Sequence, residues 1–326
     1  MLGRVKRFIR RKLDNERYPA IHAWYTARDE RKRQEAYERH QHMTYAEIEA
    51  EIGRTYQAIF GRSVDWDNPK SYNEKMQVAK LYMPTPLKTR LADKYLVREW
   101  ITEKIGAQYL IPLLGVYDSF DEIDFSGLPD KFVMKCNHDS GSVTLVKDKS
   151  TIDIAALKQK YESALAYNFA YMGFEMHYRD IKPKIIIEQY MGDAINDYKF
   201  LCFDGKPFYC WVDVGRFGEH RRNIYNMDWE LQPFIKGGIK NTEYEYPCPE
   251  KFCDMKRIVE ILCDSFDQVR VDFYLIEDKI YFGEMTFTGA CGFSTFNPDE
   301  WDYKLGELWP FDNTVRKKVL AQKIRP

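Results

Sequence analysis

Two short runs within Val269 to Phe293 carry the residues best suited to chemistry. The first alternates apolar residues with Arg270 and Asp272, and the second alternates them with Glu284 and Thr286. Such alternation predicts a hairpin with these four polar side chains on one face. If Asp272 faces Glu284 and Arg270 faces Thr286, the two carboxylates lie about 5 Å apart at Cβ and repel unless a cation separates them. Hard oxygen ligands predict Mg²⁺, completed by water and substrate phosphates.

The register of this hairpin depends on its turn. A three-residue turn at 277–279 pairs Ile276 with Ile280 and places Tyr274 opposite Phe282. The alternative is an ordinary surface hairpin whose carboxylates face solvent. An arginine on the polar face, flanking aromatic residues and a following glycine-containing loop that can approach a ligand favour the metal site.

A second candidate site lies where one predicted strand leads into another. Residues 132–137 form a strand that carries Lys135, and a tight loop containing Ser140, Gly141 and Ser142 follows it. Backbone N–H groups and hydroxyls of such a loop can bind phosphate oxygens while the lysine adds a positive charge. The alternative is a plain hairpin turn. It is not a Walker loop, because the sequence contains no GxxxxGK[ST].

Three arginines, Arg216, Arg221 and Arg222, flank a predicted turn at 218–220. Guanidinium groups bind carboxylates and phosphates through paired hydrogen bonds, so these residues are candidates for holding an anionic substrate. The alternative is a solvated basic turn.

The composition is that of a globular protein. The chain has 326 residues, 44% of them hydrophobic, and a net charge of -1, so it can bury a large core and does not call for a nucleic-acid partner. Its seven cysteines show no CxxC spacing, which favours a reduced, cytoplasmic compartment over disulfides or structural zinc. No run reaches the roughly 20 apolar residues that cross a bilayer, and no apolar signal core is present.

The N-terminal segment is strongly basic. Residues 1–12 contain six basic and no acidic residues, with apolar residues at near-helical spacing. This pattern predicts a short amphipathic helix over Met1–Leu13, which either lies on an anionic membrane surface or docks on the protein by its apolar stripe. Residues 28–52 contain no Gly or Pro and predict an exposed helix.

Helix and strand patterns follow one another through the rest of the chain, and tight turns join the central strands, so we expect an α+β fold with antiparallel pairing. The predicted helices cover 71–81, 87–105, 152–169, 249–266 and 301–326. The predicted strands cover 109–117, 132–137, 143–146, 184–191, 197–203 and 208–214, followed by the hairpin described above.

Eight ordered blocks, from about residue 68 to 310, resemble the TupA-like branch of the ATP-grasp superfamily, which is associated with bacterial surface polysaccharide synthesis. The blocks read NPKSYNEKM, LADKYLVREW, IPLLGVYDSFDEIDF, LPDKFVMKCNHDSGS, IIIEQYMG, DYKFLCFDGKP, VRVDFYL and FGEMTFTGACGF. The resemblance implies an ATP-grasp fold, in which the nucleotide lies between two α+β subdomains with antiparallel sheets. It also implies an α/β subdomain over 61–128, a lid over 129–191 and a catalytic subdomain with a helical tail over 192–326, which follow the basic helical extension that the residue pattern predicts over 1–60.

The resemblance implies a nucleotide site on the lid side. Lys94 and Lys135 would bind the phosphates, the loop Ser140–Ser142 would belong to the mobile lid, and Asp197 would contact the ribose. The linker between the subdomains would pair with the adenine edge, and its residues are Glu188, Gln189, Tyr190 and Met191.

The resemblance implies a reaction centre on the hairpin. Arg270 would steady the acyl phosphate or the tetrahedral intermediate, and Asp272 and Glu284 would bind Mg²⁺. Many ATP-grasp ligases have a Glu-x-Asn pair of metal ligands, whereas this sequence has Thr286 in place of the asparagine. A hydroxyl is the poorer ligand, so a second metal ion would be held mainly by phosphate and water.

The activity implied is that of an ATP- and Mg²⁺-dependent carboxylate–amine ligase. It would activate a carboxylate, such as that of a uronic acid, as an acyl phosphate and join it to an amine such as an amino acid, in surface, capsular or teichuronopeptide polymer synthesis. Three alternatives remain open: a sugar kinase, a nucleotide-binding scaffold of a polysaccharide assembly, and a glycosyltransferase, although no DxD site of that class is evident.

Overall fold

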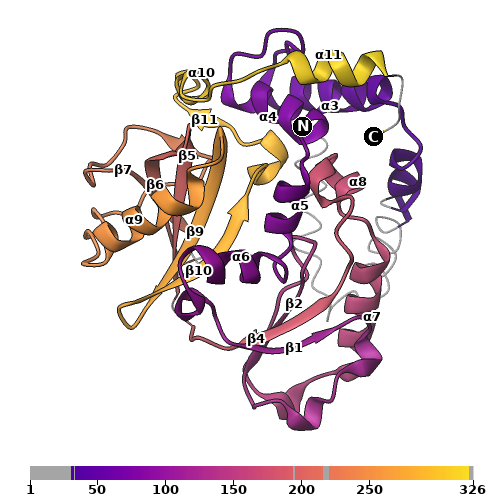
Figure 1. Cartoon of the computed structure of the whole chain (residues 1–326), viewed down its shortest axis with the longest axis vertical. Helices are drawn as coiled ribbons and strands as arrows, with labels where there is room; N and C mark the ends of the chain where they lie inside the picture. The colour runs from indigo at the N-terminus through magenta and orange to yellow at the C-terminus, as the bar shows by residue number, and fades with distance from the viewer. Residues whose placement is uncertain (1–30, 33, 194, 216–219, 323–325) are drawn as a thin grey trace, which may run out of the picture.

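Two antiparallel sheets and the helices that join them form the structure (Figure 1), a computed structural model that describes residues 31–32, 34–193, 195–215, 220–322 and 326. The predicted basic helix Met1–Leu13 lies outside the described residues. No helix among the residues described combines the length and the apolar character that a bilayer crossing requires.

The four-stranded sheet has the order β1-β4-β2-β3 and its own hydrophobic core. Phe132, Met134 and Ile187 fill this core beneath helix α7, and Tyr161 of that helix donates a hydrogen bond to the backbone of Ser142. β1 pairs with β4, although the implied division assigns its residues to the 61–128 unit. The elements are β1 (Leu113–Tyr117), β2 (Phe132–Cys136), β3 (Thr144–Val146), β4 (Ile185–Gln189) and α7 (Ile154–Ala166).

The five-stranded sheet has the order β10-β9-β5-β6-β7. Strand alternation separates its two faces: Tyr198 and Phe200 pack in the core that contains α9, while Asp197 and Lys199 lie on the opposite face. The elements are β5 (Asn196–Phe203), β6 (Lys206–Val214), β7 (Arg221–Asn226), β9 (Gln268–Ile276), β10 (Lys279–Thr286) and α9 (Phe252–Cys263), with a small separate sheet of β8 (Ile235–Lys236) and β11 (Phe296–Asn297).

The β9–β10 hairpin confirms the two predicted pairs, Asp272 with Glu284 and Arg270 with Thr286. The predicted turn is wrong, because only Glu277 and Asp278 form it, both in the left-handed region, and Ile276 pairs with Lys279. Tyr274 consequently faces Tyr281 rather than Phe282.

A bulge at Gly283 then shifts the register back by one residue, which is why Asp272 still meets Glu284. A Cβ at Gly283 would lie 3.1 Å from the carbonyl oxygen of Asp272, so glycine permits this close approach.

The helices differ from prediction at two breaks. The run 28–52 is interrupted at 41–44, where Thr44 and Glu47 form a capping box that starts α3, and α3 buries Ile48 and Ile52 instead of standing exposed. Ser71 and Glu74 form a second capping box, which starts α4 (Tyr72–Tyr82).

The predicted helix 87–105 is two helices, because the side chain of Asp93 accepts hydrogen bonds from the backbone N–H groups of Tyr95 and Leu96. The predicted tail helix is likewise two. The remaining helices are α3 (Tyr45–Phe60), α4 (Tyr72–Tyr82), α5 (Pro86–Ala92), α6 (Val97–Lys104), α8 (Ala170–Gly173), α10 (Glu300–Glu307) and α11 (Thr314–Ala321).

Candidate active site

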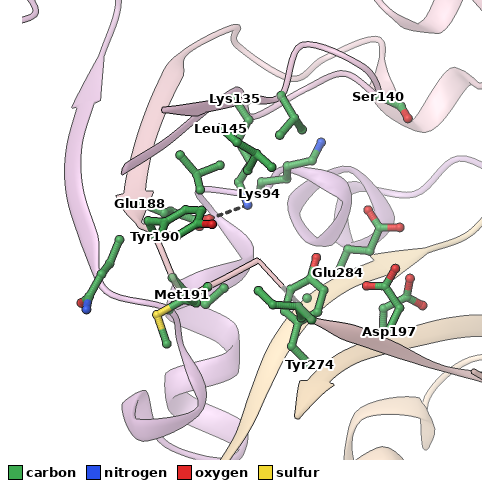
Figure 2. Close-up of a pocket in the computed structure, with 18 of the residues that line it drawn as sticks. Lys94, Lys135, Ser140, Leu145, Glu188, Tyr190, Met191, Asp197, Tyr274 and Glu284 are labelled. Atoms are coloured by element: carbon green, nitrogen blue, oxygen red, sulfur yellow. Dashed lines mark ion pairs between the residues drawn. The ribbon is translucent and has the colours of Figure 1, made fainter. Parts of the chain in front are cut away.

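A cavity of about 360 Å³ is lined by residues of both large sheets (Figure 2). One wall comes from β2, the loop after it and the end of β4, and the other comes from β5, β9 and β10. The predicted site residues that line it are Lys94, Lys135, Ser140, Gly141, Glu188, Gln189, Tyr190, Met191, Asp197, Asp272 and Glu284. Segments as far apart in the sequence as 94 and 284 therefore meet here.

Lys94 is positioned by the break between α5 and α6. Its neighbour Asp93 is buried and accepts a hydrogen bond from the side chain of Asn137 at 2.9 Å. The backbone N–H of Lys94 donates to the carbonyl of Asn137 at 3.0 Å, and its Nζ donates to the carbonyl of Asp139. Burial lowers the pKa of Lys94, although Glu284 and Asp139 favour its charged form. The ammonium is therefore held at the cavity by contacts with backbone oxygen.

Lys135 forms the ion pair that Figure 2 marks with a dashed line. Its Nζ lies 2.6 Å from Oε2 of Glu188 on the neighbouring strand, and Arg98 lies 3.4 Å from the other oxygen of that carboxylate. Since the Glu188 side chain faces Lys135, any contact of this residue with an adenine edge would come from its backbone. The linker then continues through Tyr190 and Met191, which also border the cavity.

In the 139–142 loop the second serine, Ser142, forms hydrogen bonds with neighbouring residues of the protein. The hydroxyl of Ser142 accepts a hydrogen bond from the backbone N–H of Cys136 at 2.8 Å and donates to the Asp139 carboxylate at 2.6 Å. Ser142 is buried and does not line the cavity, whereas Ser140 and Gly141 do. Ser142 thus shapes the loop that presents the other two residues.

The opposite wall contains a buried charge network centred on Lys199. Its Nζ lies 2.8 Å from Asp197, 3.4 Å from Asp213 and 3.6 Å from Asp272. Sequence reasoning identified Asp197 and Asp272 but missed Lys199 and Asp213. The alternation of β5 was a usable signal, because it places Lys199 on the same face as Asp197.

Arg270 bridges the two hairpin carboxylates and lies behind the cavity rather than in its lining. Its Nε and Nη2 donate to the two oxygens of Asp272, each at 2.7 Å, and Nη2 also lies 2.7 Å from Oε1 of Glu284. Burial raises the pKa of Asp272 against the opposing effect of Arg270. Burial also opposes ionisation of Glu284, but the charges of Arg270 and Lys94 outweigh it and lower the pKa of Glu284 to about 2.

The hairpin carboxylates fit a divalent cation. One nitrogen, Nη2 of Arg270, contacts oxygens of both Asp272 and Glu284, so the two carboxylates already converge on a single positive group. Among the residues described, no group of three or more His, Cys, Asp or Glu side chains is arranged to hold a metal ion, and a pair of carboxylates completed by phosphate and water suits Mg²⁺. Thr286 donates a hydrogen bond to Glu284 at 2.9 Å and so orients that carboxylate.

The sequence of residues 74–309 matches the family model described as TupA-like ATPgrasp. The chain belongs to the TupA-like ATP-grasp family. ATP-grasp enzymes are ligases that use ATP with Mg²⁺, and the chain is an ATP- and Mg²⁺-dependent enzyme of this kind. The fold class expected from the sequence is confirmed.

The TupA-like ATP-grasp chain is also similar to solved structures, at low identity. A D-alanine–D-alanine ligase from Bacillus anthracis is 17% identical, with 70% of this chain and 69% of that chain covered and a TM-score of 0.40. An L-amino acid ligase from Bacillus licheniformis is 12% identical, with 74% and 55% covered and a TM-score of 0.41. No curated protein matches the chain.

Two of the three predicted arginines, Arg221 and Arg222, do not line the cavity of this ATP-grasp protein. Arg222 forms a paired contact with Asp213, at 2.5 and 2.8 Å, and Arg221 donates to the carbonyl of Asn241. Arg216 lies outside the described residues. Arg222 therefore belongs to the charge network of the five-stranded sheet, one strand removed from Lys199.

Proposed function

We propose that this protein is a carboxylate–amine ligase that forms an acyl phosphate. The observation that carries the proposal is the arrangement of opposite charges across one cavity. Lys94 and Lys135 border one wall, and Asp272 and Glu284 border the other, with Arg270 directly behind them. Cations that face a pair of carboxylates suit a bound nucleoside triphosphate whose terminal phosphoryl group lies between the two walls.

Each residue then has a task in two balanced steps. In the first, a substrate carboxylate oxygen attacks the terminal phosphorus of ATP, and ADP leaves. In the second, an amine attacks the carbonyl carbon, phosphate leaves, and the amine loses a proton. Lys94 and Lys135 hold the phosphates in position, and Arg270 stabilises the oxyanion formed by amine attack. Asp272 and Glu284 would hold Mg²⁺, which would supply charge neutralisation at the phosphoryl group when bound.

The substrates belong to the same proposal and rest on the family. We propose a uronic acid unit of a surface or capsular polysaccharide as the carboxylate and an amino acid as the amine. The proposal includes the division of the chain into four units, with boundaries after residues 60, 128 and 191. It also includes a cytoplasmic location, with Met1–Leu13 on the inner membrane surface. The partners in this proposal are small-molecule substrates or polysaccharide precursors, and nucleic acid is not among them.

Calorimetric titration with a non-hydrolysable ATP analogue, with and without Mg²⁺, tests the nucleotide site. We expect Mg²⁺-dependent binding that Asp272→Asn and Lys135→Ala both weaken. ADP release with sugar acids and amino acids, followed by mass spectrometry, then identifies the product. An amide supports the ligase, a sugar phosphate indicates a kinase, and failure of the unsubstituted protein to bind the analogue refutes the proposal.

A further inference from the structure

A second cavity lies against the segment that carries Lys94. Its volume is about 690 Å³, and its lining comes from residues within 84–96 and 179–184, the second of which leads into β4. Asp93 and Tyr95 border this cavity, whereas Lys94 between them borders the first one. The two cavities have no lining residue in common. We call the second cavity the α5 groove.

The lining of the α5 groove is mainly apolar. Pro84, Pro86 and Ile181 contribute to it, together with Tyr95 and Leu96. Leu96 is 45% exposed, so an apolar ligand in the groove would cover a leucine that now faces water. Burial of such apolar surface favours binding of a ligand that carries an apolar body.

Four cations also border the α5 groove. The Nζ atoms of Lys182 and Lys184 both lie 2.8 Å from one oxygen, Oδ1 of Asp118, so two ammonium groups share a single exposed carboxylate. Arg90 and Arg179 complete the set, each paired with one exposed carboxylate. Ion pairs between exposed groups contribute little free energy, so these cations can exchange their partners for an anionic ligand.

Asn137 connects the α5 groove to the nucleotide lysine. It is fully buried, and its side chain donates to the Asp93 carboxylate at 2.9 Å and to the carbonyl of Lys182 at 3.0 Å, while it accepts from the backbone N–H of Lys184 at 2.7 Å. Its backbone carbonyl accepts from the N–H of Lys94 at 3.0 Å. One residue therefore holds both segments of the groove and the segment that presents Lys94 to the nucleotide.

We infer that the α5 groove binds an anionic amphiphile with a phosphate headgroup, and that this binding strengthens the binding of the nucleotide. Lys182 and Lys184 hold the headgroup, because a phosphate monoester offers a separate oxygen to each ammonium. The apolar body lies against Leu96 and the two prolines. A ligand that fixes the two segments of the groove also fixes Asn137 and, through it, Lys94. The inference needs only nucleotide binding and does not depend on the proposed ligase reaction.

The test titrates the full-length protein with n-octyl phosphate, kept below its micelle concentration, in a calorimeter. Octyl β-D-glucoside has the same tail without the charge, inorganic phosphate has the charge without the tail, and both should bind at least about tenfold more weakly. The affinity for octyl phosphate should fall about tenfold in Lys182→Met/Lys184→Met. It should rise in Asp118→Asn, which releases both ammonium groups. Lys158→Met removes a lysine from another exposed lysine–aspartate pair, on α7, and should leave binding unchanged.

The second readout is the affinity for a Mg²⁺-bound, non-hydrolysable ATP analogue. It should rise by about fivefold when octyl phosphate saturates the groove, and the analogue should raise the affinity for octyl phosphate by the same factor, because coupling between two sites is reciprocal. The gain should be absent in Lys182→Met/Lys184→Met.

Several outcomes overturn the inference. Equal affinities for octyl phosphate and octyl glucoside refute it, as does unchanged octyl phosphate binding in the double variant. Binding that leaves the nucleotide affinity unaltered refutes the connection through Asn137. Binding to anionic vesicles without binding of octyl phosphate assigns these lysines to a membrane surface instead. Failure to bind the ATP analogue refutes the proposed function, whereas titration with octyl phosphate alone tests the groove without a nucleotide.

Discussion

The two walls of the cavity handle charge in different ways. On the wall of the four-stranded sheet, Lys135 has one carboxylate partner, Glu188, and Lys94 contacts a carbonyl. On the wall of the five-stranded sheet, Lys199 and Arg270 lie among carboxylates from neighbouring strands in a continuous buried network. Isolated lysines can exchange a partner for phosphate, whereas a network held by four strands keeps its geometry. The comparison indicates that the first wall binds the phosphates and that the second wall positions the reacting groups.

Asp272→Asn, in the second wall, should have the largest effect on turnover. It removes a negative ligand from the Mg²⁺ pair and one carboxylate from Arg270, so we expect turnover to fall by about a thousandfold, read as ADP release. Asp278→Asn, on the exposed turn of the same hairpin, is the matched control. Turnover near the unsubstituted value would show that the hairpin carboxylates do not take part in the reaction.

Lys199→Met tests whether the network holds the second wall together. Three carboxylates, those of Asp197, Asp213 and Asp272, would lose their shared cation in a buried setting. We expect the free energy of unfolding in urea to fall by about 3 to 5 kcal/mol. Lys206→Met, an exposed lysine at the start of β6, should have little effect. A similar loss in both variants would argue against the network.

Lys80 of α4 contacts the segment that follows β10, a strand of the second wall. It is 1% exposed, donates to the carbonyl of Cys291 at 3.1 Å, and has its pKa lowered by burial from 10.5 to about 8. Between these pH values the unfolded chain still binds the proton that the folded chain has lost, so the free energy of unfolding rises with pH. We expect a rise of up to about 3 kcal/mol relative to Lys80→Met.

Urea unfolding of both proteins between pH 8 and 10.5 measures this difference, with the exposed Lys104→Met as the control. A difference between unsubstituted protein and Lys80→Met that does not change over this window would show that Lys80 is solvated.

Lys135→Ala, in the first wall, should have the smallest of these effects, a loss of nucleotide affinity. Removing the ammonium leaves Glu188 with Arg98 alone, and the affinity for a Mg²⁺-bound ATP analogue should fall about tenfold. Calorimetric titration measures it. Lys158→Ala, on the exposed side of α7, is the control and should bind the analogue normally. Unchanged affinity in Lys135→Ala would assign the phosphate contacts to Lys94 alone.

Much of the candidate site was predictable because it depends on local alternation. The period of two in 269–275 placed Arg270 and Asp272 on one face, whereas Glu284 joins that face only because the bulge at Gly283 offsets the mispredicted turn. The turn was mispredicted, since the left-handed pair Glu277 and Asp278 has no glycine or asparagine to signal a two-residue loop.

Other features depend on partners far away in the sequence. The end of α5 is set by Asp93, whose side chain accepts hydrogen bonds from the backbone N–H groups of Tyr95 and Leu96, ahead of α6, and from the side chain of Asn137 after β2. Helical periodicity continued through this position, so no local pattern marked the break. Likewise, nothing near Arg222 in the sequence indicated that Asp213 would take up its guanidinium.

By itself, the sequence determined which residues of β9 share a strand face, that a helix is capped at Ser71, and which family blocks the chain carries. These are properties of neighbouring residues, because side-chain direction and capping act over a few positions. Only the tertiary structure decided that Lys199 lies among three carboxylates and that Glu188 lies beside Lys135. Both depend on strands paired across long sequence separations, and burial turns that pairing into strong charge interactions.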